Sequence, residues 1–130
     1  MHQDNKNIKY DLEERTARFS EDILSFNQQV RRNMVNAHII YQLTRSGTSI
    51  GANYCEANGA CSKKDFKNKI HYCKKESKET EYWLRMINKS NPEHIKSIMK
   101  LRQENHEFTL IFSKILSSMR KSAIPKLKIK

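Results

Sequence analysis

Apolar side chains recur at intervals of three and four residues along most of the chain, with polar residues between them. This spacing matches the period of an amphipathic α-helix and not the alternation of a strand. Four runs carry the pattern, and their inward positions are Leu12, Phe19, Ile23, Phe26 and Val30; Ile40, Leu43, Gly47, Ile50, Tyr54 and Ala57; Phe66, Ile70, Cys73, Ser77, Thr80, Leu84 and Ile87; Ile98, Leu101, Asn105, Phe108, Phe112, Ile115 and Met119. Each run is about 20–27 residues long, or about 30–40 Å as a helix.

Short connections separate the four runs, which favours an all-α fold class and an antiparallel up-down-up-down four-helix bundle. Residue pairs typical of helix starts are Asp11 with Glu14 before the first run, Ser62 with Asp65 before the third, and Asn91 with Pro92 before the fourth. The first connection is expected near residues 31–36. We assign residues 1–119 to the bundle and residues 120–130 to a basic C-terminal tail that is broken at Pro125.

The second run places Gly47 and Gly51 among several other small residues. Glycine inside a helix costs about 1 kcal/mol relative to alanine, so these positions need an offsetting gain. Close approach of a neighbouring helix would supply that gain. A loop over residues 46–51 is the alternative, but the apolar register continues through the stretch, and we favour a continuous helix.

The composition argues against some fold classes and against a membrane or secreted location. The chain has 130 residues with only three glycines and two prolines, which argues against an all-β fold rich in turns. No apolar run reaches the length of about 20 residues that a membrane-spanning helix needs. The first residues also lack the apolar stretch of a signal peptide. We expect a cytoplasmic protein that makes no membrane contact.

The sequence offers little for catalysis or metal binding. Cys55, Cys61 and Cys73 form no CxxC pair, which indicates reduced thiols, and the five histidines lack zinc-ligand spacing. Glycine-rich phosphate loops, paired carboxylates and a Ser–His arrangement are also missing. We therefore predict no catalytic residues, no metal ligands and no cofactor, and classify the chain as a non-enzyme.

The charge is large and uneven. Lys and Arg number 25 against 14 Asp and Glu, for a formal net charge of +11. Residues 63–91 hold nine basic and four acidic side chains, and residues 119–130 hold five basic and none acidic. Nearly all of the net charge therefore lies on the third run (+5) and the tail (+5). Such an excess is typical of proteins that bind polyanions.

The third run also orders its cations, which fall in a stripe beside the apolar face when the run is wound at 3.6 residues per turn. The predicted nucleic-acid-binding residues are Lys63, Lys64, Lys67, Lys74, Lys75, Lys78 and Arg85, with Arg120 and Lys121 from the tail. A row of cations can neutralise several phosphates and release counterions, so binding to RNA or DNA would be salt-sensitive and weakly sequence-specific. A merely solvated surface is the alternative.

The other flank of the third run mixes acidic and aromatic residues, and a polar row follows one face of the second run. These eight residues form the predicted interface with another subunit: Tyr72, Glu76, Glu79 and Trp83 from the third run, and Arg45, Ser49, Asn53 and Glu56 from the second. Trp83 and Tyr72 completing the rim of the core is the alternative. We expect Arg45 to pair with Glu76 or Glu79, within or between subunits, because isolated charges in such segments usually pair.

Three stretches resemble one bacterial family: Gln42-Leu43-x-Arg45-Ser46-x-x-Ser49-Ile50-x-x-Asn53-x-x-Glu56, then Lys64-Asp65-Phe66, and Glu76-Ser77-x-Glu79-Thr80-x-x-Trp83-Leu84. The family is the four-helix bundle proteins called 23S rRNA intervening-sequence proteins, which are similar in fold to accessory proteins of diversity-generating retroelements. The resemblance covers about residues 40–88. The chain departs from the family at Ala57, where glycine is common.

The resemblance implies a small antiparallel bundle that assembles into a homopentameric ring. It also implies nucleic-acid binding, and a reverse transcriptase as a partner of the retroelement relatives. The family assigns no agreed chemistry to the polar positions that Arg45, Ser49, Asn53, Glu56 and Glu79 match. We predict a homo-oligomeric bundle that binds RNA or DNA through its basic face. A protein-binding adaptor or scaffold without a nucleic-acid role is the alternative.

Overall fold

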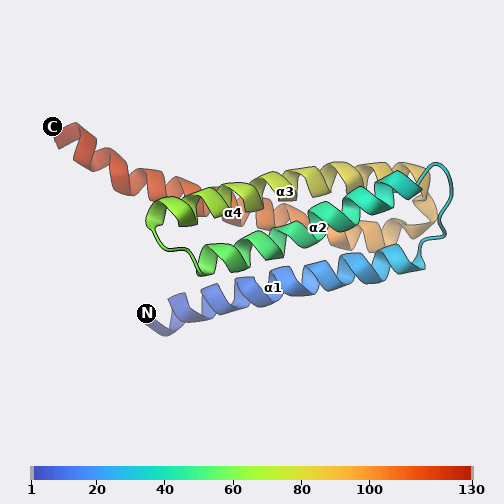
Figure 1. Cartoon of the computed structure of the whole chain (residues 1–130), viewed down its shortest axis with the longest axis horizontal. Coiled ribbons are helices and arrows are strands. Elements are labelled where there is room, and N and C mark those ends of the chain that lie inside the picture. Colours follow the sequence, from blue (N-terminus) through green and yellow to red (C-terminus); the bar gives the residue numbers. More distant parts are fainter. Residues whose placement is uncertain (1, 130) are drawn as a thin grey trace.

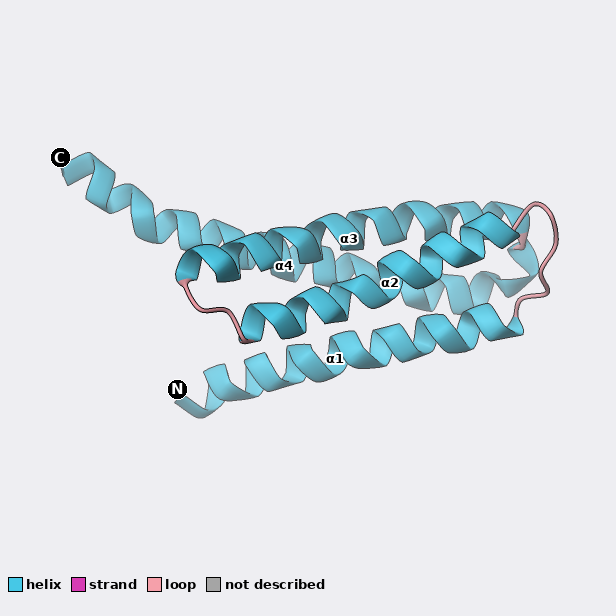
Figure 2. Ribbon diagram, viewed as in Figure 1, coloured by secondary structure: helices cyan, strands magenta, loops and turns pink. Residues whose placement is uncertain are grey.

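The computed structural model describes the backbone of residues 2–129 and the side chains of residues 12–121. Its described part consists of four long helices and one short 3-10 turn, without strands: α1 (His2–Gln29), α2 (Ala37–Asn58), α3 (Lys63–Ser90), η1 (Pro92–His94) and α4 (Ile95–Ile129). The helices lie along one long axis and are joined at alternating ends (Figures 1 and 2). The predicted all-α four-helix architecture is confirmed.

The apolar positions of all four helices meet in one core. Phe19, Phe108 and Phe112 are its largest fully buried side chains, and the rings of Phe19 and Phe108 pack edge to face with centroids 5.3 Å apart. Near the end of α4 the prediction is partly wrong, because Leu116 is buried while Ile115 is only partly buried. A four-residue step from Phe112 keeps Leu116 on the inner face, and so the register moves by one residue.

The glycines of α2 allow it to lie directly against α1. A Cβ atom added at Gly47 would lie 3.0 Å from Ile23, and one at Gly51 would lie 3.2 Å from the backbone oxygen of Thr16. The helix continues without a break through both residues. The expected close approach and the continuous helix are therefore confirmed, and the short distance between the two helices is the gain that offsets the poor helix propensity of glycine.

A layer of buried hydroxyl and amide groups crosses the core between α3 and α4. The Asn105 side chain donates to the Ser77 backbone oxygen at 2.8 Å and accepts from the Ser77 hydroxyl at 3.0 Å. Nearby, the Thr80 hydroxyl donates to Ser46 of α2 at 3.0 Å. Because each of these groups is buried, a shift of one helix along another would leave donors unpaired at a cost of about 1–3 kcal/mol each. The layer therefore fixes the register of the helices.

Two predicted helix boundaries and one predicted capping side chain are wrong, whereas the expected helical start at Pro92 is correct for the turn η1. α1 begins at His2 and not near Asp11, since no proline or glycine interrupts residues 2–11. α4 continues past Pro125 to Ile129, which proline disfavours by about 3 kcal/mol but does not forbid. Asn91 does not cap a helix with its side chain, because that side chain bonds Asn36 and Glu93. The Ser62 cap is confirmed, since its hydroxyl accepts from the Asp65 amide at 3.0 Å.

The cysteines are free thiols in two environments. Cys55 and Cys61 are exposed, whereas Cys73 is fully buried in the core. Burial raises the pKa of the Cys73 thiol to about 12, because the thiolate would lose its hydration. Cys73 therefore acts as a small apolar core residue. Within the described part of the chain, no helix has both the length and the apolar character needed to cross a membrane.

Candidate nucleic-acid interface

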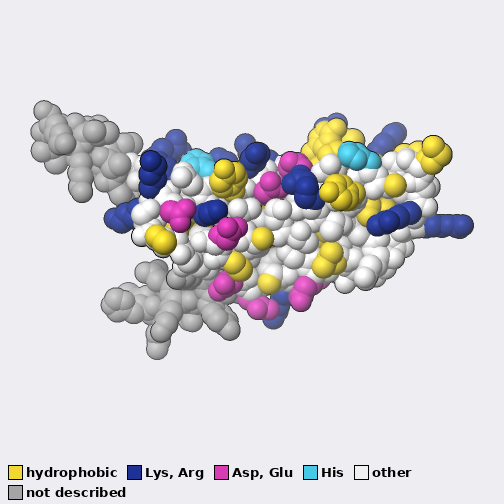
Figure 3. Space-filling view, viewed as in Figure 1, with side chains coloured by type: hydrophobic (Ala, Val, Ile, Leu, Met, Phe, Trp, Pro, Cys, Tyr) yellow, Lys and Arg dark blue, Asp and Glu magenta, His cyan; other side chains and the backbone are white. Residues whose placement is uncertain are grey.

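Seven of the predicted basic residues lie on α3, where steps of four and seven residues place five of them on one side of the helix, and the other two lie on α4. Lys63, Lys64, Lys75, Lys78 and Arg85 are exposed, as are Arg120 and Lys121 of α4, while Lys67 and Lys74 are half-buried. In the face shown in Figure 3, Lys and Arg side chains follow the α3 edge and several Asp and Glu side chains gather along the α1 edge. We call these nine cations the basic stripe.

The basic stripe has no internal counter-charge. Among the side chains of residues 12–121, no carboxylate lies within ion-pair distance of any of its nine cations. The nearby carboxylate of Glu81 on α3 instead accepts from Arg102 of α4 at 2.6 Å. Unpaired cations along one edge produce a positive field that attracts polyanions.

The acidic residues of α4 are held on its other side by α1. The guanidinium of Arg15 donates to Glu104 at 2.6 Å and to Glu107 at 3.2 Å. The hydrogen bond that Arg15 donates to Glu104 raises the pKa of Arg15 above its usual value. This arrangement keeps both carboxylates away from α3, and the flank of α4 beside the basic stripe carries Arg102 and Arg120 without a free acid.

Part of the basic stripe surrounds a pocket between α3 and α4. The pocket has a volume of about 210 Å³ and is lined by Lys67, His71 and Lys74 from α3 and by Ser113, Leu116 and Arg120 from α4. The structure thus brings together Lys67, Lys74 and Arg120, three cations that the sequence predicted separately. It does not place Lys63, Lys64, Lys75, Lys78, Arg85 or Lys121 in the pocket lining.

His71 and Ser113 are the polar pocket residues that sequence reasoning missed. His71 lies four residues after Lys67 and three before Lys74, so a helical projection of the sequence could have placed it between these cations. Ser113 carries no comparable signal, because its position beside α3 depends on the register between two helices. Both side chains add hydrogen-bond donors to a cationic pocket.

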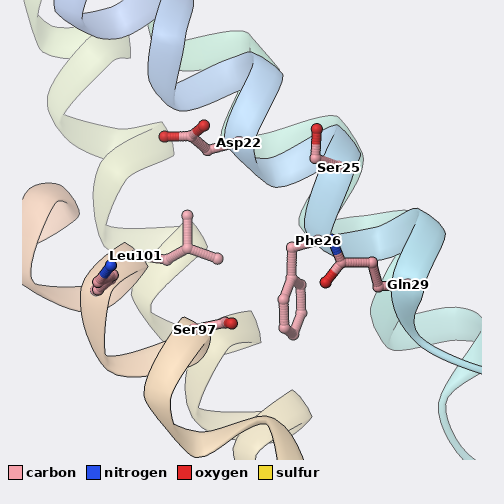
Figure 4. Close-up of a pocket in the computed structure, with 7 residues that line it drawn as sticks. Asp22, Ser25, Phe26, Gln29, Ser97 and Leu101 are labelled. Carbon is pink, nitrogen blue, oxygen red and sulfur yellow. The ribbon is translucent and has the colours of Figure 1, made fainter.

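A second groove separates α1 from α4 but has a different character. Its volume is about 270 Å³, and the side chains of Phe26 and Leu101 point into it (Figure 4). The polar lining includes one acid, Asp22, and one cation, Lys100, so the ionic groups of this groove carry no net charge. It is therefore poorly suited to polyanions.

The predicted interface residues lie on the α2–α3 face, where the charged ones are paired within the chain. Arg45 donates to Glu76 at 3.2 Å and also forms an ion pair with Glu79. The expected pairing of Arg45 with the third helix is thus confirmed within one chain. Glu56 instead pairs with Lys69 of α3 at 3.2 Å, and this lysine is not one of the stripe cations.

The remaining predicted interface residues show two kinds of surroundings. Ser49 donates to the Arg45 backbone oxygen and Asn53 to the Ser49 backbone oxygen, so both side chains bond to the backbone of their own helix. Trp83 packs against the core rim, donates to Glu79 at 3.1 Å and contacts His38 and Tyr82 edge to face. Tyr72 is 49% exposed. A contact with another subunit at this face stays a prediction.

The comparisons with known proteins agree with this architecture. The model of one protein family, described as 23S rRNA-intervening sequence protein, matches residues 9–114, which is most of the chain. The chain belongs to the 23S rRNA-intervening sequence protein family. The resemblance predicted from residues 40–88 is therefore confirmed. For this intervening-sequence protein, a comparison with curated proteins found no match.

A solved structure shares the fold of this intervening-sequence protein. It is the crystal structure of a protein of unknown function from the S23 ribosomal protein family of Bacteroides thetaiotaomicron. The two chains are 30% identical with a TM-score of 0.70, over 80% of this chain and 96% of the other. The family match ends at residue 114, so it includes most of the basic stripe but not Arg120 or Lys121.

Proposed function

We propose that this intervening-sequence protein is a non-enzymatic bundle that binds RNA or DNA through the basic stripe, with little sequence specificity. The observation that carries the proposal is the absence of carboxylate partners for the nine stripe cations among the described side chains. Cations that only solubilise a protein are usually interspersed with acids. Here the three glutamates of α3 and the two of α4 are bound instead to Arg45, Arg102 and Arg15.

The dimensions of the stripe support the same proposal. Lys63 and Arg85 are 22 residues apart on one helix, which places them about 33 Å apart at 1.5 Å per residue. One strand of a duplex carries a phosphate about every 3.4 Å, so the stripe is long enough to follow several phosphates. Lysine on a flexible stem recognises charge and not base edges, and this favours contacts to the backbone.

The salt dependence of binding tests the proposal. Titrating a labelled RNA and a DNA of the same sequence at two or more salt concentrations should show affinity falling steeply with salt, with a logarithmic slope of about −4 or steeper if five or more cations contact phosphates. Two unrelated sequences should bind with affinities within about threefold of each other. Weak binding at every salt concentration would contradict the proposal and favour the adaptor alternative.

We also propose that the protein is a homo-oligomer that buries part of the α2–α3 face. Three tyrosines, Tyr41, Tyr72 and Tyr82, are about half or more exposed on these two helices, and the Tyr82 ring contacts Trp83, which packs against the core. Exposed aromatic rings beside satisfied charges are typical of protein interfaces. In a ring, copies of the basic stripe would act together on one polyanion and raise its apparent affinity.

Solution mass tests the oligomer. Light scattering should give a multiple of 15.4 kDa for the native protein, and Tyr72→Arg should shift the mass toward one chain because it places an unpaired charge in the contact. Leu110→Arg is the matched control, since Leu110 is similarly exposed (55%) but lies on α4. A native monomer, or equal masses for both variants, would contradict the proposed interface.

A further inference from the structure

We infer that the pocket between α3 and α4 is a seat for one phosphate group of the bound nucleic acid. This inference rests on the proposed function and makes it specific, because it assigns one point of the basic stripe a shaped, multi-donor contact. The pocket lining combines three cations, Lys67, Lys74 and Arg120, with the imidazole of His71 and the hydroxyl of Ser113. These are groups that a tetrahedral oxyanion requires.

On the α3 side, two lysines line the pocket. Lys67 and Lys74 are two turns apart with His71 between them, and all three line the same pocket. Both lysines are half-buried, whereas Lys64 and Lys75 beside them are exposed. Partial burial restricts the conformations of a side chain, so these two lysines lose less conformational entropy than their neighbours when they bind an anion.

The α4 side completes the pocket with different chemistry. Ser113 and Arg120 are seven residues apart, which places them two turns apart on the same side of the helix, facing α3. Arginine presents a planar fork that binds two phosphate oxygens at once, and serine adds one neutral donor. Leu116 lies between them in the lining and is buried, so it forms an apolar wall that excludes water from one side.

No acid of the described chain competes for the pocket. Its lining contains no Asp or Glu, and Glu81, which lies two turns beyond Lys74 on α3, is bound to Arg102. The groove between α1 and α4 provides the internal contrast, because it is larger but carries Asp22 opposite Lys100. An anion is therefore the ligand class that the α3–α4 pocket favours, and the groove does not share this preference.

A pair of matched double variants tests the seat. Lys67→Gln with Lys74→Gln removes two pocket cations, and Lys64→Gln with Lys75→Gln removes two cations of the same helix that do not line the pocket. Both variants lower the net charge equally, so the loss of long-range attraction is the same. The pocket pair should weaken binding of a short labelled RNA about tenfold more than the control pair, because charge-assisted hydrogen bonds are lost as well. Equal losses would overturn the seat and leave nucleic-acid binding standing.

Of two further measurements, the first changes no charge and the second uses no nucleic acid. Ser113→Ala removes a neutral donor, and it should weaken RNA binding about threefold without changing the salt slope. Inorganic phosphate, titrated against chloride at matched ionic strength and fixed pH, should shift the ring signals of His71 saturably in the native protein and in the control pair but not in the pocket pair. The His71→Gln variant identifies those signals by their loss.

The outcomes separate the two proposals. If RNA does not bind but phosphate shifts the His71 signals, the seat stands and the proposed function fails. If RNA binds with equal losses in both double variants and phosphate leaves the His71 signals unchanged, the proposed function stands and the seat fails. A shift that persists in the pocket pair would also overturn the seat, because the anion would then be bound elsewhere.

Discussion

Replacing Asn105 with aspartate is expected to lower the free energy of unfolding by about 4 kcal/mol at pH 7, from a pKa shift of about three units at 1.36 kcal/mol each. Asn105 lies on α4, is 1% exposed and bonds Ser77 of α3. Its Nδ2 atom donates to the Ser77 backbone oxygen at 2.8 Å. An ionised carboxylate there would face that oxygen without a donor, and it would lose its hydration without a cation in return.

The penalty should depend on pH in a predictable direction. Burial raises the pKa of the new carboxyl in the folded state above its unfolded value of about 3.9. Below about pH 4 the carboxyl is protonated in both states, and its hydroxyl can donate to the Ser77 oxygen as the amide does. The destabilisation therefore grows as pH rises above about 4 and becomes constant above the raised folded-state pKa.

Urea unfolding at pH 4.5 and pH 7 measures this penalty. Gln103→Glu is the matched control, because it makes the same amide-to-acid change two residues away on α4 at an exposed position. That variant should stay within about 0.5 kcal/mol of the native protein at both pH values. If the two variants lose equal stability at pH 7, the buried layer does not fix the helix register as we argue.

The fold could be predicted from the sequence because one period runs through each helix. Ile40 to Ala57 and Ile70 to Ile87 keep steps of three and four, and those positions are buried in the structure. The errors occur where that signal is absent. The first turns of α1 contain few apolar residues, and Asn91 looks like a cap but bonds Asn36 across the end of the bundle. When a side chain has several possible hydrogen-bond partners, the local sequence does not show which one it bonds.

The candidate site could be predicted only within a single helix. Winding α3 at 3.6 residues per turn is enough to align Lys63, Lys67 and Lys74, and the last two line one pocket. Predicting the pocket requires more than the helical period, because Ser113 and Arg120 are brought beside Lys67 by the register between α3 and α4. That register depends on the Ser77–Asn105 contacts, which no periodicity encodes. The same layer that fixes the core therefore also positions the pocket.

Neutralising the basic stripe should have the largest effect on function. Five cations of α3 are changed to glutamine, namely Lys63, Lys67, Lys74, Lys78 and Arg85. Each phosphate contact contributes about 0.9 to the logarithmic salt slope, or about eightfold in affinity near 0.1 M salt. Because a flexible polyanion can use other cations in part, we expect RNA affinity to fall about a thousandfold. The magnitude of the logarithmic salt slope should fall below about 1.

A control with the same charge change separates the stripe from net charge. It replaces five exposed cations outside the stripe with glutamine, namely Arg31, Arg32, Lys96, Lys100 and Lys114. Both variants lose five positive charges, so any effect of net charge alone is equal. The control should lose less than about tenfold in affinity. Equal losses in the two variants would contradict a localised binding surface.

Stability measurements should show that the stripe variant fails through binding and not through folding. Glutamine has nearly the helix propensity of lysine and arginine. Lys63 with Lys67, and Lys74 with Lys78, are like charges four residues apart on α3, and such pairs destabilise a helix by about 0.2–0.5 kcal/mol each. The variant should therefore unfold at slightly higher urea concentration than the native protein while binding RNA far more weakly. In the native protein, a bound anion would offset the repulsion between these cations. Removing the cations should therefore raise stability and lower affinity together, and a variant that loses both would have failed through folding.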